Sequence, residues 1–341
     1  MRYSDLRAAI ISQWSQPRGN SVAYLIKGAP GCGKSALGRD IITSLGGNDD
    51  NTVELNLSMR DPVDFLGTPN NSGDFTRWVP PEEFYKLRAG RPGDAHGEPC
   101  FINLEEMTDG AMPMQNAACR VIYDRCAGNL KLSPYLRIYA SGNRTEDKSG
   151  ATRLSTKLGN RVRQHDYENN LDDLVTWAQA QDIDPVLIQF WRYMPAAISD
   201  FDPNKAINAT PRSWESVSLI DISLPPRLYF AEVRGCVGEG RAAEYTAFRK
   251  VYTSLVAIED VIMNPTGVAV PDDLSALYAT VGSCGHGATA GNVERLAVYI
   301  DRLPKAFATL FWQDARKRDP KIKATKAYIS WVTANSNVIM N

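Results

Sequence analysis

One short segment of the chain combines glycine, lysine and serine at a spacing that suits phosphate chemistry. Residues 28–35 read Gly-Ala-Pro-Gly-Cys-Gly-Lys-Ser, which fits the pattern G-x-x-x-x-G-K-[ST]. A strand is expected directly before this segment and a helix directly after it, and this context supports the motif. Backbone N–H groups of such a loop converge on phosphate oxygens, and the start of the helix adds the positive end of its dipole. The predicted nucleotide-binding residues are Gly28, Pro30, Gly31, Cys32, Gly33, Lys34, Ser35 and Ala36.

Two acidic residues further along the chain are expected to supply the remaining groups that ATP hydrolysis needs, a metal ligand and a base for water. The apolar stretch 101–104 ends in Glu105 and Glu106. We expect Lys34 to reach the β- and γ-phosphates of ATP, and Ser35 to bind Mg²⁺ together with Glu105. Glu106 would orient or deprotonate the attacking water. An aspartate is usual where Glu105 stands, so one extra methylene must be accommodated at the metal.

The elements that must position these residues alternate between strands and helices in the first half of the chain. A helix expected from Ser35 has its apolar residues on one face and ends at the glycine pair 46–47. This alternation predicts an α/β fold of the P-loop NTPase type, with a parallel sheet and helices on both faces. The expected strands are 22–27, 53–57, 100–104, 136–141 and 161–166.

The second half of the chain has helix-type spacing almost throughout. We therefore divide the chain into a nucleotide-binding α/β domain, residues 1–170, and a mostly helical lid and C-terminal region, residues 171–341. Breaks are expected at the proline pair 225–226 and in a glycine-rich loop, 282–291. The expected helices are 171–181, 185–194, 212–220, 242–263, 272–281 and 293–318.

A long segment rich in glycine and proline, residues 68–98, interrupts the first half. We expect it to be a loop without regular structure. Loops of this length are usually functional, so the segment is a candidate for a pore loop or a partner-binding loop.

Several separate segments together resemble the MoxR-type branch of the AAA+ ATPases. Residues 61–67 are similar to the D-hh-G segment of that branch, and residues 105–107 with 115–117 to its Walker B motif and the helix that follows. The resemblance covers about residues 20–220. It implies an AAA+ nucleotide domain followed by a helical lid, and it brings no known chemistry to the C-terminal helices.

The resemblance also implies roles for three polar residues outside the phosphate loop. Asn143 is similar to the sensor 1 residue, which is aimed at the γ-phosphate. Arg161 lies where members of the branch carry an arginine finger, and Arg212 is similar to the sensor 2 arginine of the lid. Arg163 and Arg153 are alternatives for the finger.

Because such a finger faces the nucleotide of a neighbouring subunit, the resemblance implies a homo-oligomeric ring, and a hexamer is expected. Its expected activity is Mg²⁺-dependent hydrolysis of ATP that remodels or activates a protein partner in the manner of a chaperone. The family pattern implies a von Willebrand factor A domain protein as the client. The same ring fold also pulls nucleic acid, so the alternative is a DNA-associated motor or a replication or restriction subunit.

Composition gives no support to nucleic-acid or membrane partners. The net charge is −1, and no run of eighteen apolar residues and no signal-peptide pattern occurs, so a cytoplasmic protein is expected. One basic stretch lies near the C-terminus, and we expect it to be a solvated helix face on core aromatics rather than a nucleic-acid grip. Its residues are Arg316, Lys317, Arg318, Lys321, Lys323 and Lys326, with Trp312, Tyr328 and Trp331.

Overall fold

The computed structural model describes residues 1–16, 22–147, 150–152, 154–255 and 257–335, which form two compact units. The first unit contains Met1–Asp173 together with two later segments, Phe201–Ala206 and Thr210–Arg212. The second unit takes the remaining described residues from Leu174 onward. These two segments thus belong to the first unit, although residues of the second unit precede them in the sequence.

Five parallel strands form the sheet of the first unit, in the order β2-β5-β8-β1-β9. Strands β5, β8 and β1 are almost wholly buried, which explains why they read as continuous apolar runs. Tyr24 pairs with Tyr139 on one side and with Arg163 on the other, so β1 and its neighbours are in register at this level. The predicted α/β fold is confirmed. The strands are β1 (Tyr24–Lys27), β2 (Thr52–Asn56), β5 (Cys100–Glu105), β8 (Leu136–Gly142) and β9 (Arg163–Asp166).

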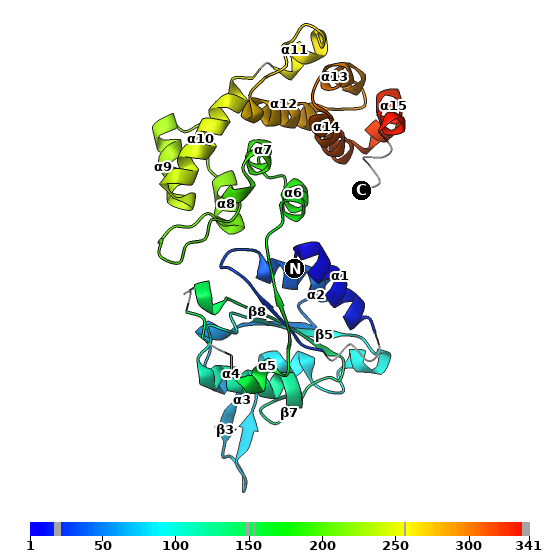
Figure 1. Ribbon diagram of the computed structural model, residues 1–341. Coiled ribbons are helices and arrows are strands. Elements are labelled where there is room, and N and C mark those ends of the chain that lie inside the picture. The colour runs from blue at the N-terminus through cyan, green and yellow to red at the C-terminus, as the bar shows by residue number, and fades with distance from the viewer. Residues whose placement is uncertain (17–21, 148–149, 153, 256, 336–341) are drawn as a thin grey trace. The chain divides into compact units, whose positions relative to one another are not determined.

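Helices cover both faces of this sheet (Figure 1). On one face lie α1 (Tyr3–Trp14) and α2 (Lys34–Ser44), and on the other lie α3 (Val63–Leu66), α4 (Met112–Cys119) and α5 (Thr156–Gly159). The i, i+4 spacing of apolar residues along α1 produces its buried stripe. That stripe is Leu6, Ile10 and Trp14, which belongs to the same cluster as Leu37 and Ile41 of α2.

Between α4 and β8 the chain forms a π-helical turn, η4 (Arg120–Asp124), and a small hairpin. The hairpin strands are β6 (Cys126–Ala127) and β7 (Leu130–Lys131).

The segment 68–98 is not the unstructured loop that its composition predicts. Strands β3 (Thr68–Asn70) and β4 (Arg77–Val79) pair as an antiparallel hairpin that projects from the first unit (Figure 1). Two 3₁₀ helices follow, Glu82–Leu87 and Pro92–His96, and Phe84 is buried in the core. Strands of three residues are too short to give a recognisable alternation, so the sequence pattern does not reveal them.

The second unit is mostly helical over its described residues. Gly282 and Gly285 lie inside a helix rather than in the expected loop 282–291. Glycine occurs at these helical positions because other segments approach them closely. A Cβ at Gly282 would lie 2.1 Å from Cγ of Gln189, and one at Gly285 would lie 3.1 Å from Cβ of Asp314. The helices are α6 (Leu171–Ala180, which begins in the first unit), α7 (Pro185–Tyr193), α8 (Pro211–Ser218), α9 (Pro226–Val237), α10 (Glu239–Thr253), α11 (Ile258–Met263), α12 (Leu274–Gly287), α13 (Val293–Ile300), α14 (Lys305–Arg318) and α15 (Lys326–Ala334).

Two further expectations for this half are wrong in detail. The expected helix 242–263 is two helices, because α10 ends at Thr253 and α11 begins at Ile258. The expected helix 293–318 also divides, since Pro304 cannot continue α13 and instead precedes the first residue of α14. The break expected at the proline pair 225–226 is confirmed, since α8 ends at Ser218 and α9 begins at Pro226, where a proline in the first turn loses no hydrogen bond.

The basic stretch near the C-terminus backs onto packed aromatic side chains. Trp312 is 1% exposed and its ring contacts those of Tyr328 and Trp331. The Arg316 guanidinium donates to the Tyr328 hydroxyl at 3.2 Å. These rings are therefore committed to the core of the second unit. Across the described part of the chain, no helix has both the length and the apolar character that a bilayer span requires.

Candidate nucleotide site

The predicted site residues other than Arg161 gather where the parallel strands end. Strand β1 ends at Lys27 and leads through the phosphate loop into α2, while β5 ends at Glu105 and β8 is followed by Asn143. Ligands of open α/β sheets bind at this carboxyl edge. The fold thus brings the loop, the acidic pair and the sensor 1 position to one edge of the sheet.

Glycine is required at two positions of the phosphate loop. Gly31 has φ +72° and Gly33, which directly precedes α2, has φ +102°, both in the left-handed region. A Cβ at Gly31 would also lie 2.6 Å from Oγ1 of Thr210. The backbone N–H of Arg212 donates to the carbonyl oxygen of Gly31 at 3.3 Å. The predicted sensor 2 segment therefore lies directly against the phosphate loop within the first unit.

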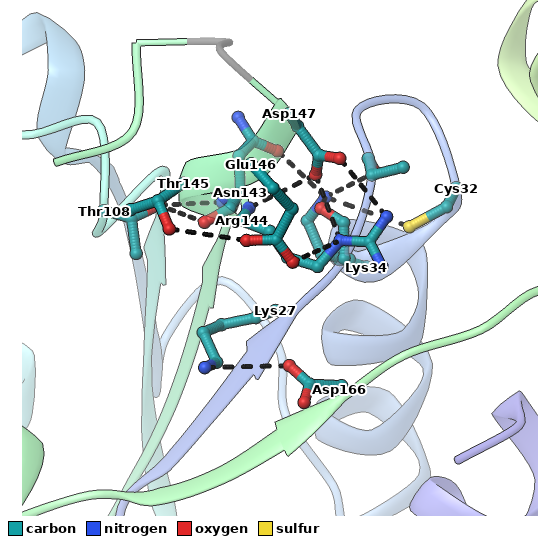
Figure 2. Close-up of polar contacts among 12 residues, drawn as sticks. Lys27, Cys32, Lys34, Thr108, Asn143, Arg144, Thr145, Glu146, Asp147 and Asp166 are labelled. Carbon is teal, nitrogen blue, oxygen red and sulfur yellow. Dashed lines mark hydrogen bonds and ion pairs between the residues drawn. The ribbon is translucent and has the colours of Figure 1, made fainter. Parts of the chain in front are cut away.

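Lys34 is the one charged residue of the loop, and its side chain is almost fully buried. It is 8% exposed, and burial lowers the pKa of its ammonium group. Its Nζ donates to the carbonyl oxygens of Gly28 and Ala29, each at 2.8 Å, and to Oδ1 of Asn143 at 3.0 Å (Figure 2). Cys32 is buried beside it, with Sγ 3.8 Å from Nζ, and burial raises the pKa of this thiol.

The orientation of Asn143 is fixed by two residues that the sequence reasoning missed. The Asn143 N–H donates to Oγ1 of Thr108 at 2.7 Å, and its Nδ2 donates to Oδ2 of Asp109 at 2.8 Å. Burial raises the pKa of the Asp109 carboxyl, and the negative charge of Glu106 adds to this effect. A chain of hydrogen bonds thus runs from Lys34 through Asn143 to Asp109. The polar turn that follows β5 is the one signal that could have pointed to these residues.

An ion pair that the sequence did not predict lies beside Lys34. Arg144 donates to both carboxylate oxygens of Asp147, each at 3.2 Å (Figure 2). Asp147 is 5% exposed. The side of the site after β8 is therefore a hydrogen-bonded polar cluster rather than a plain turn.

The two acids at the end of β5 have different partners. Oε1 of Glu105 accepts from the Arg39 guanidinium at 3.1 Å, and the same guanidinium pairs with Glu54. Glu106 has φ +53°, a left-handed conformation that is uncommon outside glycine, and its Oε2 accepts from the Ser58 hydroxyl. Backbone strain of this kind is concentrated at functional sites. The turn therefore directs Glu105 and Glu106 to separate partners.

The predicted metal ligands fit Mg²⁺. Ser35 and Arg39 are four residues apart on α2 and so share a face of the helix. Because Arg39 contacts Glu105, that carboxylate lies within side-chain reach of the face that carries Ser35. Hydroxyl and carboxylate oxygens are the ligands that Mg²⁺ prefers. Within the described residues no group of three His, Cys, Asp or Glu side chains could hold a metal.

Arg161 lies at the opposite edge of the sheet from the phosphate loop. It precedes β9, whose first residue, Arg163, pairs with Tyr24 at the start of β1, whereas the loop follows the end of β1. A four-residue strand separates the two levels by about 10–13 Å. The structure thus does not bring Arg161 to Lys34 of the same chain. The alternative finger Arg153 lies outside the described residues.

Comparisons with known proteins complete this description. Neither models of protein families nor curated proteins match the sequence. Among solved structures, NtrX from Brucella abortus matches at 17% identity and a TM-score of 0.41, over 91% of this chain and 67% of that chain. Its complex with ATP matches at 14% identity and a TM-score of 0.40, over 92% and 68% of the two chains. A point mutant of RuvB from Thermotoga maritima matches at 14% identity and a TM-score of 0.39, over 82% and 80%. These scores are low, so the fold rests on the sheet order and the phosphate loop themselves.

Proposed function

We propose that this chain is an AAA+ ATPase of the MoxR type, which hydrolyses ATP with Mg²⁺ as a ring of identical subunits and thereby remodels or activates a protein partner. The observation that carries the proposal is the contact between Lys34 and Asn143 at 3.0 Å, beside the acidic end of β5. It joins a cation for the β- and γ-phosphates to an amide at the γ-phosphate position, within reach of a carboxylate that can act on water.

Each residue of the first unit has a distinct task in this proposal. The loop N–H groups and Lys34 hold the phosphates, and Asn143 positions the γ-phosphate and the water. Arg212 contributes a second cation, which its backbone contact with Gly31 keeps next to the loop. Mg²⁺ held by Ser35 and Glu105 would neutralise charge that develops on the phosphate oxygens.

Glu106 is the proposed base. Its carboxylate comes from a left-handed backbone position and is hydrogen-bonded to Ser58. Both restraints hold it in one direction, which is what a group that orients a water must do. The negative charge of Glu106 also acts on Asp109, so the two carboxyls belong to one electrostatic unit next to Asn143.

The place of Arg161 supports a ring. An arginine that stabilises the transition state must contact the γ-phosphate, and Arg161 lies about 10–13 Å along the sheet from its own loop. We therefore assign it to the nucleotide of a neighbouring copy, and a head-to-tail contact of this kind gives a ring where the rotation closes. We propose a hexamer.

The projecting hairpin supports a protein client rather than DNA. All residues of β3 and β4 are exposed, including the large apolar side chains of Trp78 and Val79. Phe75, between the two strands, is 80% exposed. Exposed aromatic side chains of this size are typical of surfaces that bind protein. We propose that this hairpin contacts the client, and that the client is a von Willebrand factor A domain protein.

The substitution Glu106→Gln tests the catalytic assignment. The variant should bind ATP normally but lose turnover, because an amide cannot take the proton of the water. ATP affinity and phosphate release measure the two steps separately. Glu105→Gln is the matched control, since it changes the metal side and should raise the Mg²⁺ requirement first. Hydrolysis that survives in Glu106→Gln and stops in Glu105→Gln would reverse the roles of the two acids.

A further inference from the structure

An arginine and a tyrosine form a stacked pair on the surface of the first unit. The guanidinium carbon of Arg161 lies 4.1 Å from the centre of the Tyr123 ring. Tyr123 is 64% exposed, which is unusual for a large aromatic side chain. The catalytic roles assigned above do not use this ring.

The backbone beneath Tyr123 is firmly anchored. The residue lies in the π-helical turn η4, between Ile122, which is 5% exposed, and a left-handed residue, Arg125, with φ +53°. The Arg125 side chain donates to the carbonyl oxygen of Leu136 at 2.9 Å. Single π-helical turns are rare and occur often at functional sites. The turn therefore presents the Tyr123 ring from a fixed position.

Arg161 is anchored in the same way. Its neighbours Leu158 and Val162 are buried, at 0% and 9% exposure, and its N–H donates to the carbonyl oxygen of Leu158 at 2.9 Å. Both backbones are thus fixed, and the stacked side chains are the part of the pair that stands at the surface.

We infer that Tyr123 is a positioning residue for Arg161, which it holds extended at the subunit boundary. This inference rests on the proposed role of Arg161 as a finger that acts in the next subunit. A ring face attracts the flat side of a guanidinium and leaves the N–H groups at its edge free to donate. A carboxylate partner would occupy those N–H groups and reduce the charge that the γ-phosphate must meet. An aromatic support therefore suits a finger better than an ion pair does.

The second candidate arginine differs in this respect. Nη1 of Arg163 donates to Oε1 of Gln13 and to the Tyr24 hydroxyl, each at 3.1 Å. Its Nη1 group is therefore engaged within its own subunit. Arg163 also lies over a ring, that of Tyr24 at 5.6 Å, so the aromatic contact alone does not separate the two arginines. The hydrogen bonds of Nη1 do, because they reduce what Arg163 can offer to a phosphate.

The experiment compares three variants in assembled rings. Tyr123→Ala should lower the turnover number about two- to fivefold, the effect expected of an exposed cation–π contact, and leave the KM for ATP unchanged. Tyr123→Phe keeps the ring and should retain wild-type turnover. Tyr85→Ala is the matched control, because Tyr85 is also exposed and carries Arg88 at 3.9 Å from its ring, and it lies after the hairpin that is proposed to contact the client. Its turnover should equal that of wild type.

The outcomes separate this inference from the proposed function. If Arg161→Ala leaves turnover unchanged, the finger assignment itself is wrong. If Arg161→Ala slows hydrolysis strongly while Tyr123→Ala equals wild type, the finger stands and the positioning role is overturned. Equal loss in Tyr123→Phe and Tyr123→Ala would assign the effect to the hydroxyl group and also overturn it. Native mass spectrometry of each variant measures assembly, and loss of rings in Tyr123→Ala would make Tyr123 an interface residue instead.

Discussion

At the scale of single residues, the site depends on a buried cation that the chain itself surrounds with oxygen atoms. Three oxygens within 3.0 Å compensate the burial of Lys34, and one of them belongs to Asn143, the predicted sensor 1 residue, which directly follows β8. Burial without such partners would cost several kcal/mol for a charged group. The hydrogen bonds of Lys34 therefore make its buried position possible.

Replacement of this cation gives the most direct test of the loop. Lys34→Ala should weaken ATP binding by about 100-fold or more, because a hydrogen bond to a charged group contributes roughly 1.5–3 kcal/mol and Lys34 serves two phosphates. Lys27→Ala is the control, since Lys27 is on the preceding strand but pairs with Asp166 at 3.6 Å (Figure 2). Nucleotide titration measures both. An affinity of Lys34→Ala within a few-fold of wild type would disprove the phosphate-loop assignment.

The raised pKa of Asp109 predicts that a neutral side chain at this position makes the folded protein more stable than wild type at pH 7 but not at acidic pH. Because folding raises this pKa, the folded chain holds the proton more tightly than the unfolded chain does. The stabilising contribution is complete below the unfolded pKa, about 4, and is lost as the pH rises through the higher folded value. Asp109→Asn, which keeps an acceptor for Asn143, should thus be more stable than wild type at pH 7 and equally stable near pH ~3.5. Urea unfolding at both pH values measures this, and a less stable variant at pH 7 would contradict it.

Residues of the site differ in how well the sequence predicts them. The phosphate loop is predictable because its geometry depends on consecutive residues, including glycines at left-handed positions. Asp109 and Tyr123 are not predictable in this way. Their roles arise from contacts with Asn143 and Arg161, residues that only the folded sheet brings near, and polar or aromatic residues in a turn carry no local signature of such contacts.

At the scale of elements, the projecting hairpin and the 3₁₀ helix after it divide one segment into an exposed part and a core part. Phe75 is 80% exposed near the hairpin turn, whereas Phe84 is fully buried and packs near Phe65 with ring centres 5.6 Å apart. Composition alone does not distinguish the two phenylalanines. Their difference comes from where the sheet core ends.

This division predicts opposite effects of two substitutions. Phe84→Ala should lower the free energy of unfolding by about 3–5 kcal/mol, the usual result for a buried phenylalanine. Phe75→Ser should change it by less than about 0.5 kcal/mol, as exposed positions do. In a Glu106→Gln background, Phe75→Ser should nevertheless lose the captured client in a pull-down. Capture that is unchanged would remove the hairpin from the proposed client surface.

Helix α12 gives a second element-scale prediction, about packing in the second unit. Gly282→Ala should destabilise the protein by about 1–3 kcal/mol, because the added Cβ would overlap Gln189 of α7. Gly235→Ala in α9 meets no atom within 4 Å and should instead stabilise by about 0.5–1 kcal/mol. Denaturant unfolding of the two variants compares them. Equal effects would mean that α7 and α12 are not in close contact.

All five strands of the sheet lie within two residues of the expected bounds. For β1, β5 and β8 the reason is burial on both faces, which makes a parallel strand a continuous apolar run. That reason does not apply to β2 and β9, which contain polar and exposed residues. The helix boundaries at Thr253 and Pro304 were missed because the same apolar periodicity continues across both breaks. Periodicity reports which face is buried and not where a helix stops.

At the scale of the whole molecule, two edges of one sheet carry different parts of the proposed machinery. The phosphate loop, Glu106 and Asn143 belong to the carboxyl edge, whereas Arg161 precedes the first residue of β9 at the other. An enzyme that worked as a single copy could not use Arg161 at its own site. Arg161→Ala should therefore bind ATP almost normally and hydrolyse it about 10³–10⁵-fold more slowly, the contribution typical of an arginine finger.

Mixed rings test whether that arginine acts across a boundary. In a blend of Arg161→Ala and Glu106→Gln chains, some sites combine an intact Glu106 with an intact Arg161 from the neighbouring chain. Part of the ATPase activity should return, although neither variant is active alone. A blend of Arg161→Ala with the double variant Arg161→Ala/Glu106→Gln is the control, because it contains no intact finger and should stay inactive. If native mass spectrometry shows mixed rings and the first blend also stays inactive, Arg161 does not act in trans, and the ring would have to be argued from another residue.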